Sequence, residues 1–544
     1  MSNRIIETIK PDFIPFKKIK GVKGSKNIET NFPTYLIDES KLGGGHAEYL
    51  YFPKNELEIA SLLKYFNEQK IPVTISGART GIVGSAVPIY GGAVLSLEKM
   101  TNILGIGKDP DRYWLRCQPG VNLTDINISV MHKTLKCDNI PETDNILKLF
   151  KEEKQGFYYP LDPTEMSATI GGTIATNASG ARTYKYGPTR DWIRKLRVIL
   201  TNGEILDISR GQYITKEGKF IIKTSSGEIN IQVPKYKMPK AKNAAGVYAM
   251  KEMDLIELFI ASEGLFGIIS EVDIWLTERH PLISDVLFFP SEIDAVKFVE
   301  NIKKDQIASP EFIEYYDKNA LSLLRKKQLE DPKFIDMPDI PENAGGAIFF
   351  DMSFSEDSLE EKFKAIEVIA KKSNTTIENS WSGYEERELT RFKHFRHCLP
   401  ETVNNIIAER KKTFPKLHKL GTDMSVEDQH FEEMMKFYRK ELEEANLEYV
   451  IFGHIGNSHV HVNILPKNME ELEKGKQLYK KFAKKAVSFG GSVSAEHGIG
   501  KIKHEYLQIM FGDESIQEMK ALKQSFDPKL ILNPGNIFAY QEVS

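Results

Sequence analysis

The sequence predicts an α+β protein with two main domains. At 544 residues the chain is too long to fold around a single hydrophobic core. Glycine concentrates at residues 77–92 and again at 171–187, among segments with helical and strand-like patterns. Beyond Pro281, strand-like and helical segments alternate in a way that is typical of an α+β domain with antiparallel strands. We therefore expect a glycine-rich α+β domain, a boundary near Pro281 and a second α+β domain.

The composition is that of a soluble globular protein, with 41% hydrophobic and 27% charged residues. A net charge of −3 gives no electrostatic reason to expect a nucleic acid as a partner. The sequence shows neither the apolar core of a signal peptide at its start nor a run of about 18 apolar residues that would span a membrane. Cys117, Cys137 and Cys398 are scattered, which argues against disulfides or an iron–sulfur cluster and favours a reducing compartment. We expect a cytoplasmic protein.

Local patterns predict the elements of the first domain in order. ELEIASLLKYFNEQK (56–70) has the apolar spacing of a helix, and IPVTISG after it has strand character. KLRVILTNGEILDI predicts a β-hairpin, with Asn202-Gly203 as a two-residue turn. LFGIISEVDIWLT (265–277) is a further strand-rich segment.

The second domain is expected to alternate strands and helices. VLFFP is strand-like, and SEIDAVKFVENIKK is a helix with Ser291 at its cap position. GGAIFFDMSF, a helix over 357–372 and a strand near Thr376 repeat this alternation. The polar, proline-bearing segment 325–345 is predicted to be a surface loop.

Two glycine-rich stretches of the first domain favour an extended cofactor that carries phosphate. SGARTGIVGSAVP (76–88) matches neither a dinucleotide-binding Rossmann turn nor a nucleotide-binding P-loop. Glycines nevertheless let backbone N–H groups approach phosphate oxygens closely. YPLDPTEMSATIGGTIATNASGARTYKYGPTRDW (159–192) is rich in small residues, against which a flat ligand can lie. Taken one at a time, the two stretches are equally well explained as tight loops with turn glycines.

Three histidines lie within eight positions in GHIGNSHVHVNIL, which reads as a hairpin turning at residues 456–458. With residues 457–458 at the centre of the turn, His454 lies opposite His461; with residues 456–457 there, it lies opposite His459. Either register puts the three rings on one face, together with Asn463. Two imidazoles across a strand pair are a start for a Zn²⁺ or Mn²⁺ site.

The segment GSVSAEHGIGK adds a carboxylate and a fourth histidine. Glu496 would complete a metal site and leave open positions, and His497 would exchange protons near neutral pH. The alternative is a hairpin whose polar-face histidines bind nothing.

These stretches together resemble one family, the FAD-dependent D-2-hydroxyacid dehydrogenases of the vanillyl-alcohol-oxidase type. The matching pieces are SGARTGIVG, SATIGGTIATNASGARTYKYG, LTNGEIL, SEGLFGIISEV, GHIGNSHVHVN, SAEHGIGKIK and FDPKLILNPGNIF, from about residue 45 to the end. The resemblance implies a two-subdomain FAD-binding domain of the vanillyl-alcohol-oxidase (PCMH) type plus an α+β cap domain with an antiparallel sheet. We expect an N-terminal extension at 1–44, the FAD domain at 45–281, the cap with the metal site at 282–510, and a segment at 511–544 that returns to the FAD domain.

The resemblance also implies roles for particular residues. His497 is the expected catalytic base, and His454, His461 and Glu496 are the expected ligands of a divalent metal, Zn or Mn, which selects the register that pairs His454 with His461. The expected substrate contacts are Arg396, Lys419, Asn463 and His459. Binding of FAD is expected from Ser76, Gly77, Ala78, Arg79, Thr80, Gly81, Gly84, Ser85, Pro160, Ser167, Gly171, Gly172, Ala175, Thr176, Gly180, Glu263, Gly267, Ile269 and Asn533.

The implied reaction is the oxidation of a D-2-hydroxy acid, D-lactate-like, to the 2-oxo acid. The metal would lower the pKa of the substrate hydroxyl, His497 would take its proton, and the α-hydrogen would pass as hydride to flavin N5. Electrons would leave to an electron-transferring flavoprotein, an iron–sulfur subunit or a quinone, and a homodimer and a subunit of a complex both remain open. The competing functions are a transferase similar to alkyl-glycerone-phosphate synthase and a flavoprotein that only transfers electrons.

The chain departs from the family pattern at several positions. The family hairpin GHxGDGNxH becomes GHIGNSHVH, so His459 replaces an asparagine and either adds a ligand or reshapes the pocket. Arg79 stands where the family has a small or amide residue, and is expected to meet a phosphate. Pro400 occupies a position at which 2-hydroxyglutarate enzymes carry a hydroxyl, which argues against that substrate. For Arg396 by itself, a surface salt bridge competes with a substrate contact.

Overall fold

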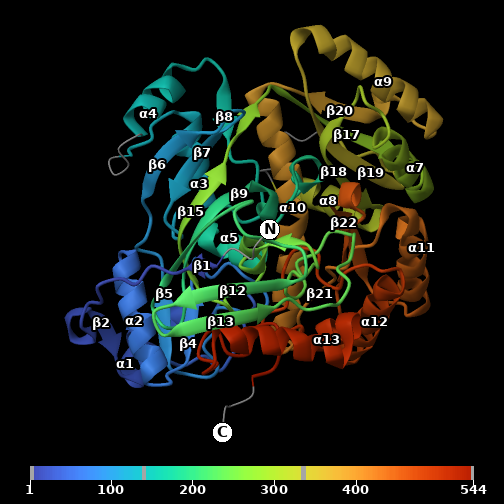
Figure 1. The fold of residues 1–544 in the computed structure, drawn as a ribbon. Coiled ribbons are helices and arrows are strands. Elements are labelled where there is room, and N and C mark those ends of the chain that lie inside the picture. Colours follow the sequence, from blue (N-terminus) through green and yellow to red (C-terminus); the bar gives the residue numbers. More distant parts are fainter. Residues whose placement is uncertain (1–4, 138–142, 332–338, 541–544) are drawn as a thin grey trace.

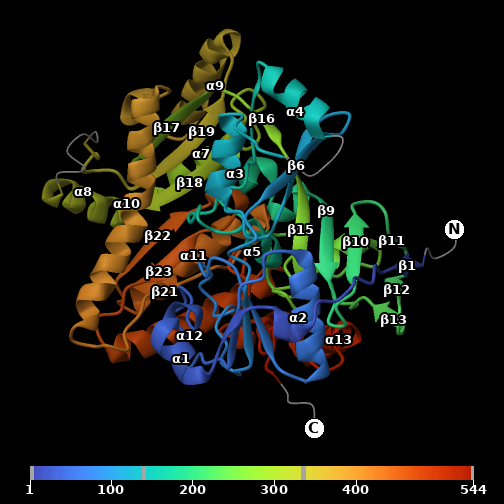
Figure 2. The same cartoon turned by 90° about the vertical axis from the view of Figure 1, so that its left-hand side faces the viewer.

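Six β-sheets and the helices around them make up the part of the chain that the computed structural model describes, residues 5–137, 143–331 and 339–540 (Figure 1). Figures 1 and 2 show two lobes, one built on the blue-to-green strands and one on the olive-to-orange strands. No helix among the described residues combines the length and the apolar character that a bilayer crossing needs.

A four-stranded sheet in the order β2-β3-β5-β4 supports the first glycine stretch. Its strands are β2 (Gly21–Lys23), β3 (Tyr49–Tyr51), β4 (Val73–Ser76) and β5 (Ala93–Ser96), and α1 (Ser25–Asn31) follows β2. The expected helix is α2 (Glu56–Glu68), whose first turn is capped by the Asn55 side chain accepting from Glu58 N. Strand β4 ends at Ser76, so the glycine stretch begins where this strand stops.

The second sheet of this lobe is antiparallel, in the order β10-β9-β15-β7-β6. Its strands are β6 (Ile103–Lys108), β7 (Tyr113–Cys117), β9 (Ile193–Ile199), β10 (Ile205–Ser209) and β15 (Ile268–Trp275), and the helices beside it are α3 (Leu123–Met131), α4 (Thr143–Glu152), α5 (Ile170–Thr176) and α6 (Thr183–Tyr186). The predicted β9–β10 hairpin is present, but its turn has three residues because Leu200 N bonds to Glu204 O. Gly203 takes the left-handed conformation (φ 83°) that such a loop requires at its last position.

Short strands of the N-terminal segment pair with other strands of this lobe. Strand β1 pairs in parallel with β12, and β2 pairs with β3, so residues before 44 join two different sheets. The remaining short strands are β1 (Ile6–Glu7), β8 (Gly156–Tyr158), β11 (Ile214–Thr215), β12 (Lys219–Thr224), β13 (Gly227–Gln232), β14 (Met253–Asp254) and β16 (Thr277–Arg279).

The second lobe is built on a seven-stranded antiparallel sheet in the order β20-β17-β19-β18-β22-β23-β21. Its strands are β17 (Leu282–Phe289), β18 (Pro310–Asp317), β19 (Gly346–Ser353), β20 (Ser380–Gly383), β21 (Leu420–Gly421), β22 (Tyr449–Gly453) and β23 (His461–Ile464). Both faces are covered: Phe289 of β17 meets Phe298 of α7 on one face, while on the other Phe288 lies beside Trp381 of β20, which meets Phe395 of α10.

Among the described residues, seven α-helices belong to this lobe, and two of them adjoin the histidine hairpin, one before β22 and one after β23. They are α7 (Glu292–Ile302), α8 (Lys318–Glu330), α9 (Leu359–Lys372), α10 (Glu386–Lys411), α11 (Asp428–Glu444), α12 (Met469–Ser488) and α13 (His504–Phe526). Ser291 caps α7 as expected, accepting from Asp294 N. Figure 1 shows α13 beneath β12 and β13, against which the end of the chain returns.

Two predicted boundaries in this lobe are wrong. Residues 325–330 belong to α8 rather than to a loop, because the apolar face of that helix (Ala320, Leu321, Leu324) outweighs its polar C-terminal half; the segment 332–338 lies outside the described residues. The strand expected near Thr376 begins at Ser380, after a 3-10 helix at Ile377–Asn379.

Candidate active site

The histidine hairpin is formed by β22 and β23, but in the register that the family resemblance did not select. Phe452 pairs with His461 and Ile451 with Val462, which places residues 456–457 at the centre of the turn. The pairing of His454 with His461 is therefore wrong. Gly453 leaves the strand at φ 117° and a 3-10 helix at Ile455–Asn457 follows, so the ladder ends two residues before the turn.

The three imidazoles nevertheless gather on one side of the hairpin. The ring centroids of His454 and His461 are 5.6 Å apart, and His459 lies 5.6 Å from the first ring and 4.6 Å from the second. The ring of His497 stacks over that of His461 at 5.6 Å. Four histidines from two segments thus occupy one small volume.

Two of these rings aim a nitrogen at one oxygen of Glu496. His454 Nε2 lies 3.4 Å and His461 Nε2 lies 3.8 Å from Glu496 Oε2. His461 Nδ1 donates to Thr422 O at 2.9 Å, which leaves its Nε2 lone pair free. Zn²⁺ and Mn²⁺ prefer a donor set of two neutral imidazole nitrogens and a carboxylate oxygen. The atoms of these side chains that face away from the site are held by other groups. These residues therefore fit a divalent metal.

Glu314, a residue the sequence analysis did not single out, orients His454 from behind. Its Oε1 lies 3.2 Å from His454 Nδ1, and its carboxylate accepts from Arg396 Nε at 3.1 Å. Burial alone would raise the pKa of Glu314, but Arg396 and His454 outweigh it and lower this pKa to about 2. Burial likewise opposes the charge of His454, yet the charge of Glu496 raises the pKa of His454 to about 9. Metal binding through Nε2 therefore has to overcome the tendency of Glu496 to favour the protonated form of His454.

His497 is oriented by a buried aspartate. Its Nδ1 lies 3.2 Å from Asp423 Oδ2, and its side chain keeps 26% of its surface exposed. Burial would raise the pKa of Asp423, but His497 and Lys503 hold it well below its ordinary value. A carboxylate behind Nδ1 fixes the ring and leaves Nε2 as the atom that can accept a proton.

Asp423, His461 and His497 form a second group of donors within ligand distance of one another. The Asp423 carboxylate is already saturated, since it accepts from Lys503 Nζ (2.9 Å), Ser494 Oγ (2.5 Å) and the N–H groups of residues 496 and 497. We therefore assign the metal-binding geometry to the group that contains Glu496.

His459 does not join either group of donors. Its ring is fully enclosed, its Nε2 lies 3.4 Å from Asp423 Oδ1, and burial lowers the pKa of His459 to about 4. A ring without accessible surface does not touch a substrate, in contrast to our expectation. His459 instead fills the space behind His461, because its side chain shares that face of the hairpin.

The other three expected substrate contacts, Arg396, Asn463 and Lys419, lie on different elements and have different partners. Arg396 projects from α10 and pairs with Glu314, and its Nη1 lies 3.8 Å from Asp162 Oδ2, so its salt bridge is buried rather than on the surface. Asn463 lies on β23 with its amide donating to His461 O at 3.3 Å. Lys419 precedes β21, and burial alone lowers its pKa.

Replacing Gly453 by alanine is expected to damage this site through His461. A Cβ at Gly453 would lie 2.9 Å from His461 Cδ2, and the φ of 117° costs a side chain about 1–3 kcal/mol. Gly453→Ala should therefore lower both the melting temperature and the metal content. Gly490→Ala is the matched control, because its φ is also positive (70°) but its Cβ would meet open space. Equal metal content in both variants would contradict the proposed role of the hairpin.

The two glycine stretches meet at one edge of the first lobe. A Cβ at Gly77 would lie 2.6 Å from Thr169 Oγ1, so these segments approach as closely as a glycine allows. Thr169 caps α5, and the N–H groups of its first turn are already paired, Gly171 N with Pro119 O at 2.9 Å and Gly172 N with Thr169 Oγ1 at 3.4 Å. Open space lies instead at Gly81, where a Cβ would meet no atom within 4 Å, and a loop of small residues beside such space fits a phosphate-bearing flavin.

The other expected FAD residues converge on the same edge through Glu263. Ser85 Oγ donates to Glu263 Oε2 at 2.6 Å, and Asn533 Nδ2 donates to Glu263 O at 3.0 Å. Asn533 Oδ1 accepts from Ile75 N at 2.8 Å. The remaining members fall on the loop after β4 (Ala78, Thr80, Gly81, Gly84), the segment 160–180 (Pro160, Ser167, Ala175, Thr176, Gly180) and the start of β15 (Gly267, Ile269).

The guanidinium group of Arg79 is engaged by other groups of the protein, and its expected contact with a phosphate stays a prediction. Its guanidinium group lies over the Tyr35 ring at 4.3 Å and donates to Ser76 Oγ and Gly77 O. The backbone of Arg79 also bonds to Glu39 N. Arg79 thus joins the N-terminal segment to the glycine loop.

Three residues that were not expected from the sequence each contact a predicted site residue: Glu314, Asp423 and Lys242. Glu314 carries the only local signal, since an acidic side chain in the middle of a buried aromatic strand (PEFIEYYD) needs a partner. Lys242 Nζ pairs with Glu496 Oε1. The contacts of Asp423 and Lys242 depend on tertiary structure alone.

Comparison with known proteins identifies two family domains and several relatives of nearly full length. Residues 284–537 match the family described as FAD linked oxidases, C-terminal domain, and residues 47–142 and 145–209 match the FAD binding domain family. The chain is 30% identical to a D-lactate dehydrogenase of Anaerostipes hadrus over 99% of both chains. It is 28% identical to the glycolate oxidase subunit GlcD of Bacillus subtilis (90% of this chain, 88% of the relative) and 27% identical to a D-2-hydroxyglutarate dehydrogenase of Stutzerimonas stutzeri (90% of each).

Solved structures show the same fold at much lower identity. An alkyldihydroxyacetonephosphate synthase superposes with a TM-score of 0.59 over 97% of this chain and 89% of its own, at 14% identity. At that identity the likeness establishes the fold alone. With an FAD binding domain, the C-terminal domain of FAD linked oxidases and a D-lactate dehydrogenase that is 30% identical over nearly its full length, the chain belongs to the FAD-dependent D-2-hydroxyacid dehydrogenases.

Proposed function

We propose that this enzyme oxidises a D-lactate-like D-2-hydroxy acid at a metal site held by His454, His461 and Glu496. The observation that carries the proposal is the convergence of two imidazole nitrogens on Glu496 Oε2, beside the ring of His497. When bound, FAD supplies the acceptor for the substrate's α-hydrogen with its electron pair, and the divalent metal supplies a Lewis acid for the hydroxyl oxygen.

His497 is the proposed proton acceptor. Asp423 holds Nδ1, so Nε2 is the atom that receives the hydroxyl proton, and the carboxylate stabilises the resulting imidazolium ion. The partial exposure of His497 lets that proton leave to water after each turnover.

Arg396 is the proposed partner of the substrate carboxylate. Glu314 occupies its Nε and one side of Nη2, and Asp162 Oδ2 lies 3.8 Å from Nη1, so a substrate carboxylate would bind at the Nη1–Nη2 edge by taking the place of Asp162. Glu314 thereby fixes the distance between this edge and His454, since it contacts both side chains. A fixed carboxylate anchor sets which hydrogen of the substrate faces the flavin.

Pro400 supports a substrate with a small side chain. It lies inside α10, four residues after Arg396, and therefore projects from the same side of that helix. A proline offers no side-chain hydrogen bond to a second carboxylate of the kind that 2-hydroxyglutarate carries. We place D-lactate and similar short acids first for this reason.

The electrons are proposed to leave to a separate protein or a quinone. Cys117, Cys137 and Cys398 are buried, and Cys398 lies on α10 of the other lobe, so the three thiols do not form one cluster. An electron-transferring flavoprotein, an iron–sulfur subunit or a quinone is the proposed acceptor.

Anaerobic flavin bleaching tests the proposed function. Protein mixed with a panel of D- and L-2-hydroxy acids is expected to lose its visible flavin absorption rapidly with short D-acids. Chelator treatment should abolish the bleaching, and added Zn²⁺ or Mn²⁺ should restore it. A metal-free yellow protein that no hydroxy acid reduces would contradict the proposal and favour a transferase or an electron-transfer subunit.

A further inference from the structure

Lys242 is a buried lysine that contacts the proposed metal ligand Glu496. Its side chain keeps only 6% of its surface exposed, and its Nζ pairs with Glu496 Oε1. Ser179 Oγ donates to the same oxygen at 3.0 Å. Both partners come from the flavin lobe, whereas Glu496 follows α12 of the other lobe.

The two oxygens of Glu496 therefore face different surroundings. Oε2 faces the imidazole nitrogens of His454 and His461, while Oε1 is held by Lys242 and Ser179. A carboxylate can bind a metal through one oxygen or through both. With Oε1 held in this way, only Oε2 is directed at the site.

The loop that carries Lys242 is fixed to the segment that carries Glu496. Ser425 Oγ donates to Lys242 O at 2.5 Å, and Ser492 Oγ donates to Asn243 Oδ1 at 2.6 Å. Ala244 N bonds to Ser494 O at 2.8 Å. These bonds fix the backbone of the loop at Lys242. The fixed backbone keeps the ammonium group of Lys242 within reach of Glu496 Oε1.

We propose that Lys242 is a positioning residue that keeps Glu496 a one-oxygen ligand and so leaves a coordination position open for the hydroxy acid. This proposal rests on the proposed function, because it assumes a divalent metal at His454, His461 and Glu496. The ammonium group repels the metal as well as holding Oε1. Lys242 thus lowers metal affinity in favour of substrate binding.

Removing the ammonium group should strengthen metal binding and weaken substrate binding. In Lys242→Met, Oε1 loses its charged partner and is free to turn toward the metal, and the repulsion of the cation disappears. Both changes lower the Kd for the metal, and the second carboxylate oxygen competes with the substrate for the open position. We expect the metal to dissociate about 10-fold more slowly and the KM for the hydroxy acid to rise about 10-fold, the size of effects from residues that contact metal ligands.

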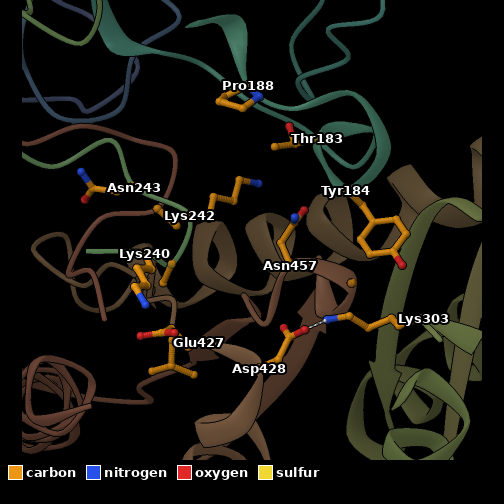
Figure 3. Close-up of a pocket in the computed structure, with 14 residues that line it drawn as sticks. Thr183, Tyr184, Pro188, Lys240, Lys242, Asn243, Lys303, Glu427, Asp428 and Asn457 are labelled. Carbon is orange, nitrogen blue, oxygen red and sulfur yellow. Dashed lines mark ion pairs between the residues drawn. The ribbon is translucent and has the colours of Figure 1, made fainter. Parts of the chain in front are cut away.

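Lys240 provides the matched control. Lys240 lies on the same loop as Lys242, and both residues line a pocket of about 510 Å³ (Figure 3). Unlike Lys242, Lys240 is exposed. Figure 3 shows Lys240, Lys242 and Asn243 along one wall of this pocket, with the ion-paired Lys303 and Asp428 across from them. Lys240→Met removes the same charge from the pocket without touching Glu496, so it separates the effect of the contact from that of the net charge.

The experiment compares the FAD-loaded wild type with Lys242→Met, Lys240→Met and Lys242→Arg. Transfer of Zn²⁺ to a coloured chelator gives the release rate, steady-state kinetics separate KM from kcat, and visible absorption of the Co²⁺-substituted proteins reports coordination number. We expect slower release, a higher KM and weaker Co²⁺ bands in Lys242→Met only, with Lys242→Arg restored toward wild type. Weaker metal binding in Lys242→Met, or equal effects in Lys240→Met, would overturn the proposal. A wild type that binds no metal would instead contradict the proposed function on which it rests.

Discussion

Replacing His497 by glutamine should slow flavin reduction by the hydroxy acid about 10³-fold, within the range for loss of a general base. Glutamine keeps the polar character of the position but has no nitrogen that accepts a proton. The metal group and Arg396 do not depend on His497, so metal content and FAD content should be unchanged and KM should change little. Stopped-flow bleaching under anaerobic conditions measures the reduction step directly.

His280→Gln is the control for that experiment, because His280 is exposed on the surface and its nearest carboxylate is 3.9 Å away. It should reduce its flavin at the wild-type rate. If His497→Gln reduced its flavin within a few-fold of wild type, another group would have to take the hydroxyl proton. If it lost FAD or metal, its slow rate would reflect a damaged site and not a missing base.

Replacing His461 by alanine should remove both the metal and the activity. The substitution deletes one of the two nitrogens that face Glu496 Oε2. The lost stabilisation of charge at the substrate oxygen is about 4 kcal/mol, which corresponds to about 10³-fold in rate. Metal per FAD, measured by mass spectrometry, should fall well below that of the wild type, and added metal should recover only part of the activity.

His459→Asn is the matched control within the same hairpin. The structure places His459 outside the ligand group, enclosed behind His461, so its replacement should leave the metal in place. Asparagine is also the residue that the family pattern carries here. Full metal content in His461→Ala would contradict the ligand assignment, and complete metal loss in His459→Asn would show that the third imidazole is a ligand after all.

Local sequence was sufficient where a local cause determines the structure. The helix at Glu56–Glu68 follows from its apolar spacing and the cap at Asn55, and α7 follows in the same way from Ser291. The composition of the histidine hairpin likewise brought the rings together in either register. These elements depend on residues that are near one another in the chain.

Sequence failed where the cause lies in backbone conformation or in distant contacts. The register of β22 and β23 depends on how the chain leaves the ladder at Gly453 and returns at Ser458, which has a positive φ of 51°. The residue types at these two positions do not predict this backbone conformation. The partners of the site come from far away: Lys242 is 254 residues from Glu496, and Glu314 is 82 residues from Arg396. No periodicity or spacing links residues that meet only through tertiary folding.

The bond from Ile75 N to Asn533 Oδ1 closes the first sheet with a residue 458 positions later in the chain. During synthesis at about 5–20 residues per second, roughly 20–90 s separate the emergence of these two segments from the ribosome. The glycine loop after β4 therefore lacks its contact with Asn533 on the nascent chain throughout that interval. If Asn533 completes the flavin site, stable capture of the cofactor should follow the release of the chain, and a chain truncated before Asn533 should retain less FAD.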